Sequence, residues 1–236
     1  MLRIIAIVLV IGPVAHAGDL CAYDGAGDRD PGADVRSLEA YAEGDATADV
    51  RFIEWCLGGA HAYAARVVAA CETIVARDKT WTDRCMVLAA EVGAPRVGTR
   101  DVFDWLARQP RGPWVTDLAL PDFPIYLLGE LRDPRGAALI VATWKDTIPV
   151  AARHEHDGPM MDEWSAWRQH TAEVLAQLGD GDTAAFLDEQ ALATVDVHVA
   201  QACRDAAGAI RERVLRTLLP PEVLAGALAA LVAAVP

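Results

Sequence analysis

Apolar residues recur at helical spacing along most of the chain. Between Ala60 and Ala76 they form a stripe at i, i+3, i+4 and i+7 spacing, made of Val67, Val68, Cys71, Ile74 and Val75. Sustained alternation of apolar and polar residues, which would indicate strands, is nearly absent. Alanine, leucine, arginine and glutamate dominate, and these residues favour helix. The pattern therefore predicts an all-α protein.

Turn residues divide this pattern into separate helices. Gly58-Gly59 and Gly93-Ala94-Pro95 are the clearest breaks in the first half of the chain. We expect helices over Asp49–Leu57 and Ala60–Ala76, a third that is capped by Thr80 and runs to about Val92, and a short one over Asp101–Arg108.

Three stretches of the chain resemble one another. They are "MVLAAEVGAPRVGTRDVFDWL" (86–106), "IYLLGELRDPRGAALIVATW" (125–144) and "EVLAQLGDGDTAAFLDEQAL" (173–192). Each contains a leucine-rich helix end, a break rich in Gly, Asp or Pro, and a second amphipathic helix. The breaks at Gly93, Asp133 and Asp180 recur after about 40 to 47 residues. A fourth stretch, from Val195 to Leu215, looks like the first helix of another such unit.

The turns "LGELRDPRGAALI" and "LAQLGDGDTAAFL", with the helix "DVHVAQACRDAAGAI", resemble HEAT-like repeats. Gly93-Ala94-Pro95 departs from that pattern because it lacks the aspartate. The resemblance implies stacked antiparallel helical hairpins, an α-solenoid or α-α superhelix, forming a single helical-repeat domain over residues 35–236. It also implies a scaffold or adaptor that binds a protein or peptide partner without catalysis.

The N-terminus has the features of a secretory signal peptide. Arg3 supplies a positive charge, Ile4–Ile11 is an apolar run, and Ala15-His16-Ala17 provides small residues before a cleavage site. The apolar run is too short to span a bilayer of ~30 Å. We expect residues 1–17 to be removed and the mature protein to be extracytoplasmic, either periplasmic or secreted.

Residues 18–34 read as an irregular acidic arm because they are rich in Gly, Asp and Pro. Asp24, Asp28, Asp30 and Asp34 suggest a calcium site as one interpretation. An EF-hand register that begins at Asp28 fails, since Ala33 stands where glycine is required. An irregular calcium site and a simple acidic arm both remain open.

The formal charge of −13 excludes non-specific nucleic-acid binding, which requires clustered basic residues. The apolar stretch from Glu222 to Val235 is shorter than the ~20 residues of a membrane-spanning helix. We expect it to pack on the body as a helix that caps the last unit, so no transmembrane segment is expected after signal removal. Lysine occurs only at Lys79 and Lys145 in this arginine- and alanine-rich chain, which indicates a GC-rich, bacterial genome.

Five cysteines are present, and an exported protein is expected to form disulfides. Cys71 and Cys85 lie on either side of the break at residues 77–80. In an antiparallel hairpin they would stand at similar height, so they are the favoured pair. Cys21 and Cys56 are the second predicted pair, and the odd count leaves at least one thiol unpaired.

The segment "RHEHDGPMMDEW" supports an alternative function. His154 and His156 share a side only on extended backbone; with Asp157 and His170 they form a candidate zinc site of an exported metal-dependent enzyme or metal-binding protein. The competing interpretation is a polar loop before a helix that begins near Pro159. HExxH, GxSxG, P-loop and Rossmann motifs are absent.

Six of the seven tryptophans recur about once per helical hairpin, a spacing typical of core packing. Trp114 differs because it follows Gly112-Pro113 in a predicted loop. It is therefore the tryptophan that we expect to be exposed, and it is a candidate binding residue.

Overall fold

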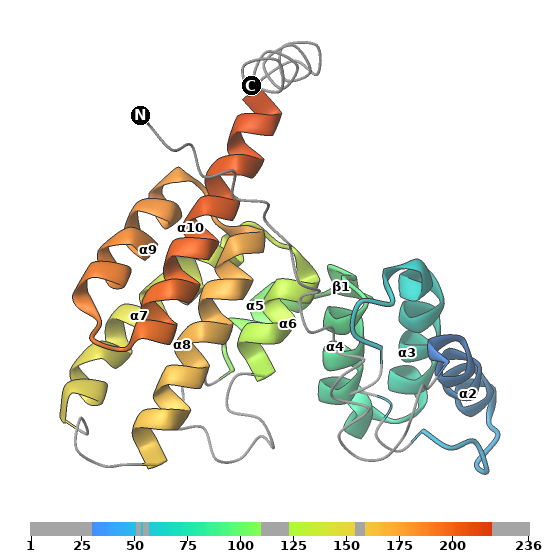
Figure 1. Cartoon of the computed structure of the whole chain (residues 1–236). Helices are drawn as coiled ribbons and strands as arrows, with labels where there is room; N and C mark the ends of the chain where they lie inside the picture. Colours follow the sequence, from blue (N-terminus) through green and yellow to red (C-terminus); the bar gives the residue numbers. More distant parts are fainter. Residues whose placement is uncertain (1–29, 51–52, 54–56, 110–122, 154–158, 219–236) are drawn as a thin grey trace. The chain divides into compact units, whose positions relative to one another are not determined.

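The protein is all-α in the computed structural model, which describes residues 30–50, 53, 57–109, 123–153 and 159–218 (Figure 1). Its elements are α2 (Pro31–Glu43), the 3-10 helix η2 (His61–Tyr63), α3 (Ala64–Arg77), the 3-10 helix η3 (Lys79–Trp81), α4 (Thr82–Glu91), β1 (Arg96–Val97), β2 (Arg100–Asp101), α5 (Val102–Leu106), α6 (Phe123–Leu131), α7 (Arg135–Arg153), α8 (Pro159–Leu178), α9 (Gly181–Ala193) and α10 (Val197–Leu218). Contacts divide the chain into two compact units, residues 1–100 and 101–236.

In the first unit, α3 packs between α2 and α4. Its apolar stripe is buried as predicted, with Val67 and Ile74 fully enclosed. Polar contacts add to this packing. The Arg66 guanidinium donates two hydrogen bonds to the Glu39 carboxylate, at 2.7 and 2.6 Å, and Arg77 donates to backbone carbonyls at the end of α2. The two helices are thus joined by both apolar burial and charge.

The prediction of an irregular arm is wrong for residues 31–34, because α2 already begins at Pro31. Asp30 is its N-cap, and the carboxylate of Asp30 accepts a hydrogen bond from the Gly32 backbone N–H at 2.9 Å. Proline at the first helical position has a suitable φ and lacks an N–H that would otherwise stay unpaired. The Asp-Pro pair therefore starts a helix in a segment whose composition indicates a loop.

The break between α3 and α4 is formed by Asp78 and not by the predicted cap Thr80. The Asp78 carboxylate accepts hydrogen bonds from the Thr80 backbone N–H at 2.9 Å and from its hydroxyl at 2.7 Å. This arrangement opens η3, which leads directly into α4. The aspartate can cap because its carboxylate reaches forward to a residue two positions later.

After α4, the predicted break at Gly93 is confirmed. Gly93 adopts a φ of 69°, the left-handed conformation common after a helix end. A two-stranded hairpin of β1 and β2 follows, and then the short helix α5, which is capped by Asp101. The hairpin is a local departure from the helical expectation.

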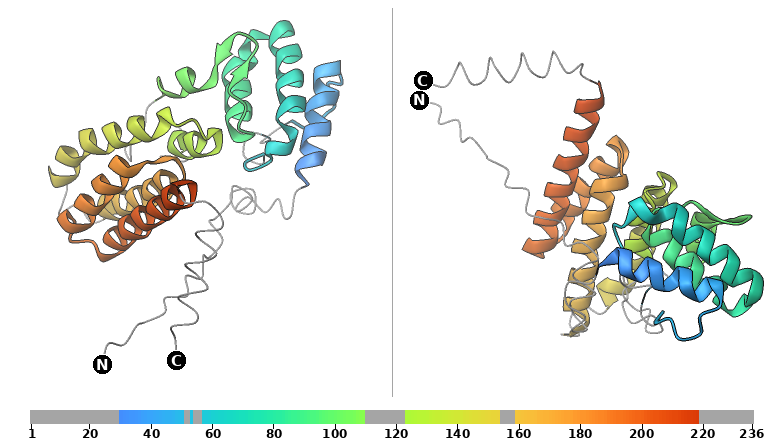
Figure 2. Two further views of the ribbon diagram at one scale, coloured as in Figure 1. Left: turned by 90° about the horizontal axis from the view of Figure 1, so that it is seen from above. Right: turned by 90° about the vertical axis from the view of Figure 1, so that its right-hand side faces the viewer.

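In the second unit, α6 contacts α8 and α8 contacts α10, while α7 contacts both α8 and α9. The most extensive packing joins α10 to α9 and α8, which flank it (Figures 1 and 2). The core of this unit contains large side chains such as Trp144, Trp167 and Leu187, all of which are buried.

Aspartates form both predicted turns of the second unit. Asp133 accepts a hydrogen bond from the Arg135 backbone N–H at 2.9 Å, and Asp180 accepts from the Thr183 backbone N–H at 3.0 Å. The turn before α9 also excludes side chains at one position. A Cβ on Gly179 would stand 2.5 Å from Thr183 Cγ2 and 2.8 Å from the Leu175 carbonyl oxygen, whereas one on Gly181 would meet nothing within 4 Å.

Trp144, Trp164 and Trp167 form an aromatic cluster that is buried, as predicted for core tryptophans. The Arg168 guanidinium lies 4.4 Å from the centroid of the Trp164 ring, a cation–π arrangement. Burial lowers the pKa of Arg168 to about 10. Its charge is therefore held against aromatic faces at a half-buried position.

Candidate functional site

Most residues of the predicted sites lie outside the described part of the chain. This applies to three predicted zinc ligands, the predicted exposed tryptophan and the second predicted cysteine pair, namely His154, His156, Asp157, Trp114, Cys21 and Cys56. These assignments stay predictions.

His170, the fourth predicted zinc ligand, lies within α8. Its ring stacks on Tyr126 with the centroids 6.4 Å apart, and its Nδ1 is 3.6 Å from a carboxylate oxygen of Glu173. Because a helix rises ~1.5 Å per residue, His170 stands roughly 16 Å along the axis from Pro159, where α8 begins. The preceding segment would have to fold back along α8 to share a metal with it.

Cys71 and Cys85 face each other across α3 and α4, as the hairpin argument predicts, and both are fully buried. The predicted disulfide between them is nevertheless absent from the structure, where both are free thiols. The Cys85 Sγ is directed at the backbone carbonyl of Cys71, 3.8 Å away. A side-chain hydrogen bond with Cys85, together with burial, raises the pKa of the Cys71 thiol, so Cys71 is held in the protonated form.

Two aspartates of the calcium interpretation are described. Asp30 caps α2 and also pairs with Arg36 at 3.2 Å, and Asp34 is buried within α2. These contacts assign Asp30 to helix capping. Among the described residues, no group of three His, Cys, Asp or Glu side chains is arranged to hold a metal ion.

The structure instead exposes large apolar side chains near the turn where α9 leads into α10. Leu192, Val195 and Val197 are 88, 88 and 70 % exposed. We call these three residues the α9–α10 tip. Single exposed apolar residues are common on protein surfaces. Three large ones within six positions of one turn make this turn a candidate binding surface.

Asp196 holds the α9–α10 tip in place. Its carboxylate accepts hydrogen bonds from the backbone N–H groups of His198 at 2.8 Å and Val199 at 3.2 Å, and from the Ser165 hydroxyl of α8. Burial raises the pKa of Asp196, but these hydrogen bonds lower it further than burial raises it. Val195 and Val197 flank a fixed N-cap, so their exposure follows from the geometry of the turn.

Sequence reasoning missed this surface because it began the helix at Val195, one residue before its cap. A signal was present in "TVDVHV", where apolar and polar residues alternate around an aspartate. An N-cap at Asp196 puts Val195 outside the helix and Val197 at its first position. Neither residue then belongs to the buried stripe that starts at Val199.

The far end of α10 has a second group of exposed apolar side chains. Leu215 and Leu218 are 55 and 72 % exposed, and Val214 beside them is half-buried. The buried residues of α10 end at Ile210. The last turns of this helix therefore continue an apolar stripe that the described part of the chain leaves uncovered.

A hollow of about 360 Å³ lies where α6 and α8 end, lined by Arg132, Pro134, Gln177 and Leu178. Arg132 adopts a φ of 55°, unusual for a residue with a side chain. It is exposed to solvent. The lining offers a cation and an amide, but it includes no nucleophile or metal ligand, so chemistry is not indicated there.

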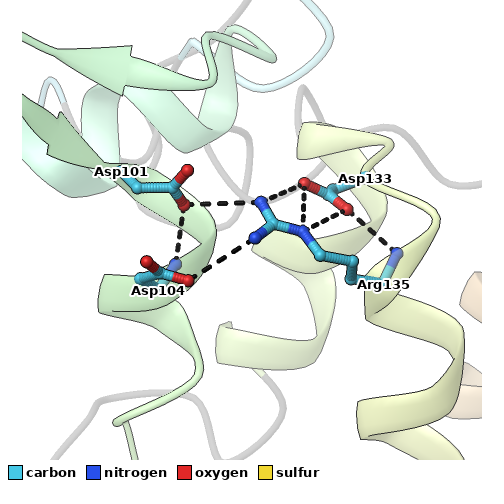
Figure 3. A network of polar contacts seen from close by, with 4 residues as sticks. All are labelled: Asp101, Asp104, Asp133 and Arg135. Carbon is cyan, nitrogen blue, oxygen red and sulfur yellow. Dashed lines mark hydrogen bonds and ion pairs between the residues drawn. The ribbon is translucent and has the colours of Figure 1, made fainter.

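Figure 3 shows a polar network of the second unit, in which Arg135 joins three acids. Its guanidinium lies 2.7 Å from Asp133 and 3.5 Å from each of Asp101 and Asp104, and it stacks on the Phe103 ring at 4.1 Å. The hydrogen bond from Arg135 holds the pKa of Asp133 below its usual value. These contacts tie α5 to the turn before α7, which is a structural role.

Within the described ranges, none of the helices is both long enough and apolar enough to pass through a bilayer. Comparisons with protein-family models, curated proteins and solved structures found no match to this chain.

Proposed function

We propose that this chain is an exported helical-repeat protein that binds a protein or peptide partner through the α9–α10 tip and carries out no reaction itself. The observation that carries this proposal is the joint exposure of Leu192, Val195 and Val197 on a turn held by Asp196. A preorganised apolar surface lowers the entropic cost of association.

The contacts of the second unit support the repeat architecture. In a stack of hairpins, first helices contact first helices and second helices contact second helices. Here α6, α8 and α10 contact one another in succession, and α7 contacts α9. The tip is then the turn between the second helix of one hairpin and the first helix of the next.

Charge favours one kind of partner. The chain carries a formal charge of −13, and Glu189 is an exposed acid one helical turn before Leu192. An apolar segment flanked by basic residues is complementary to such a surface. The signal-peptide pattern supports an encounter outside the cytoplasm.

Site-specific photo-crosslinking in the producing cell tests the proposal. A photoreactive residue in place of Val195 should capture a discrete partner, whereas one in place of Thr73, an exposed polar position of α3, should not. The captured partner, once purified, should bind the Leu192→Asp variant at least about 10-fold more weakly than the wild type, as expected for a central apolar contact.

Equal crosslinking at both positions would contradict the proposal. So would an unchanged affinity of the Leu192→Asp variant for the captured partner. The Thr73→Asp variant is the matched control, because it adds the same charge to an exposed helical position in the other unit.

A further inference from the structure

Helices α3 and α4 bring two thiols together in the interior of the first unit. Cys71 lies in the middle of α3 and Cys85 in the first half of α4, and neither side chain is exposed to solvent. The Cys85 Sγ lies 3.8 Å from the Cys71 carbonyl oxygen, and the two side chains share a hydrogen bond. The sulfur atoms are therefore neighbours that are not bonded to each other.

Another buried cysteine shows what is particular about this pair. Cys203 of α10 is also a fully buried free thiol, but it is the single cysteine in the sequence after residue 100. A lone buried thiol acts as a small apolar side chain. Two adjacent thiols on different helices can do more, because they offer two soft donor atoms to the same point.

The donor set narrows the kind of cation that fits. Thiolate sulfur prefers soft metal ions. Within the described ranges, no third His, Cys, Asp or Glu side chain completes a group with these two cysteines. A structural zinc ion requires four ligands, whereas the mercuric ion and Cu(I) bind two sulfur atoms in line. The pair therefore matches a two-coordinate soft cation.

Burial decides between these two cations. The mercuric ion and two thiols form a neutral bis-thiolate and release two protons, whereas Cu(I) leaves one net negative charge on the complex. Ile74 of α3 and Leu88 of α4 are fully buried like the cysteines, so the interior between these helices is apolar. An uncompensated charge is costly in such surroundings, and the neutral complex is favoured.

We propose that Cys71 and Cys85 form a binding site for one mercuric ion, held between their sulfur atoms across α3 and α4. Each thiol gives its proton to solvent, so that two Hg–S bonds replace two S–H bonds. Because the fold already holds the second sulfur beside the first, the pair binds the cation more tightly than two separate thiols do. The cation enters during transient separation of the helices, since neither sulfur is exposed.

Retention of mercury by the full chain in excess 2-mercaptoethanol tests this proposal, because the monothiol removes the cation from single cysteines. The wild type should retain one equivalent after gel filtration, measured by elemental mass spectrometry. Cys71→Ala and Cys85→Ala should each retain at least about tenfold less. Cys203→Ala is the matched control, since it removes an equally buried thiol and should retain the full equivalent. Cys21→Ser/Cys56→Ser should retain it as well.

A wild type that retains no mercury would overturn the proposal, and so would full retention by Cys71→Ala. Loss from Cys21→Ser/Cys56→Ser together with full retention by Cys85→Ala would assign the cation to other cysteines and would also overturn it. X-ray absorption of the loaded wild type gives a readout that does not depend on the folding of any variant. Two sulfur neighbours of mercury are expected, and a nitrogen neighbour or a single sulfur contradicts the site.

Discussion

The two ends of α10 are both apolar at the surface, yet they differ in how they are held. At its start, Asp196 caps the helix and contacts Ser165 of α8, so the exposed Val195 and Val197 occupy a fixed turn. At its end, Leu215 and Leu218 lie past the last buried residue, on turns that Arg213 ties to α8.

This difference separates two meanings of an exposed apolar residue. An apolar group on a fully hydrogen-bonded turn is available without structural rearrangement, which suits a binding surface. An apolar group that continues a buried stripe past its last buried residue belongs instead to the packing face of its own helix. Exposure alone does not distinguish these cases; the neighbouring hydrogen bonds and the continuity of the stripe do.

The largest effect on stability is expected in the buried part of α10, between its two ends. Ile210→Ala removes a fully buried side chain from the middle of α10 and should lower the free energy of unfolding of the second unit by about 2 to 4 kcal/mol. Urea denaturation followed by circular dichroism measures this change. Arg204→Ala, at an exposed position of the same helix, should cost less than about 0.5 kcal/mol. Similar losses for both variants would show that α10 is not anchored by its buried stripe.

An intermediate effect is expected at the capped end. Asp196→Ala should cost about 1 kcal/mol at neutral pH, since it removes the acceptor of the first N–H groups of α10. The hydrogen bonds lower the folded-state pKa of Asp196. Its contribution is therefore complete above the unfolded value of 3.8 and is lost as the pH falls through the lower folded value.

The stability difference between wild type and Asp196→Ala should accordingly shrink when the unfolding free energy is measured at pH 3 instead of pH 6. Asp196→Asn is the matched control, because it retains a capping oxygen without a titrating charge. A difference that is the same at both pH values would argue against the charged hydrogen bonds described for Asp196.

The smallest effect on stability is expected at the α9–α10 tip. Leu192→Ser/Val195→Ser should change the unfolding free energy by no more than about 0.5 kcal/mol, since both side chains are almost fully exposed. The midpoint of thermal unfolding reports this change. A loss of more than about 2 kcal/mol would mean that these residues serve folding and not binding.

The sequence predicts the helical class and the turns more completely than it predicts the surface. The turns at Asp133 and Asp180 could be predicted because capping depends on neighbours a few residues away. The start of α2 was missed for the opposite reason, since the Asp30-Pro31 signal lies in a segment whose overall composition indicates a loop.

Features that depend on tertiary geometry were harder to predict from the sequence. The hairpin argument brings Cys71 and Cys85 together, but bond formation depends on the direction of each Sγ, and Cys85 points at a carbonyl oxygen. The α9–α10 tip depends on where the cap of α10 lies to within one residue. With the cap at Asp196, Val195 lies outside the helix and Val197 is its first residue, and both valines are exposed.

The turn at Gly179 limits which genetic changes this region tolerates. Since any Cβ there would collide with Thr183 and the Leu175 carbonyl, every missense change at this codon disturbs the start of α9, whereas the codon for Gly181 is sterically free. The orientation of α9, and with it the placement of Leu192, thus depends on a position where no side chain fits and whose backbone N–H donates to the Leu175 carbonyl.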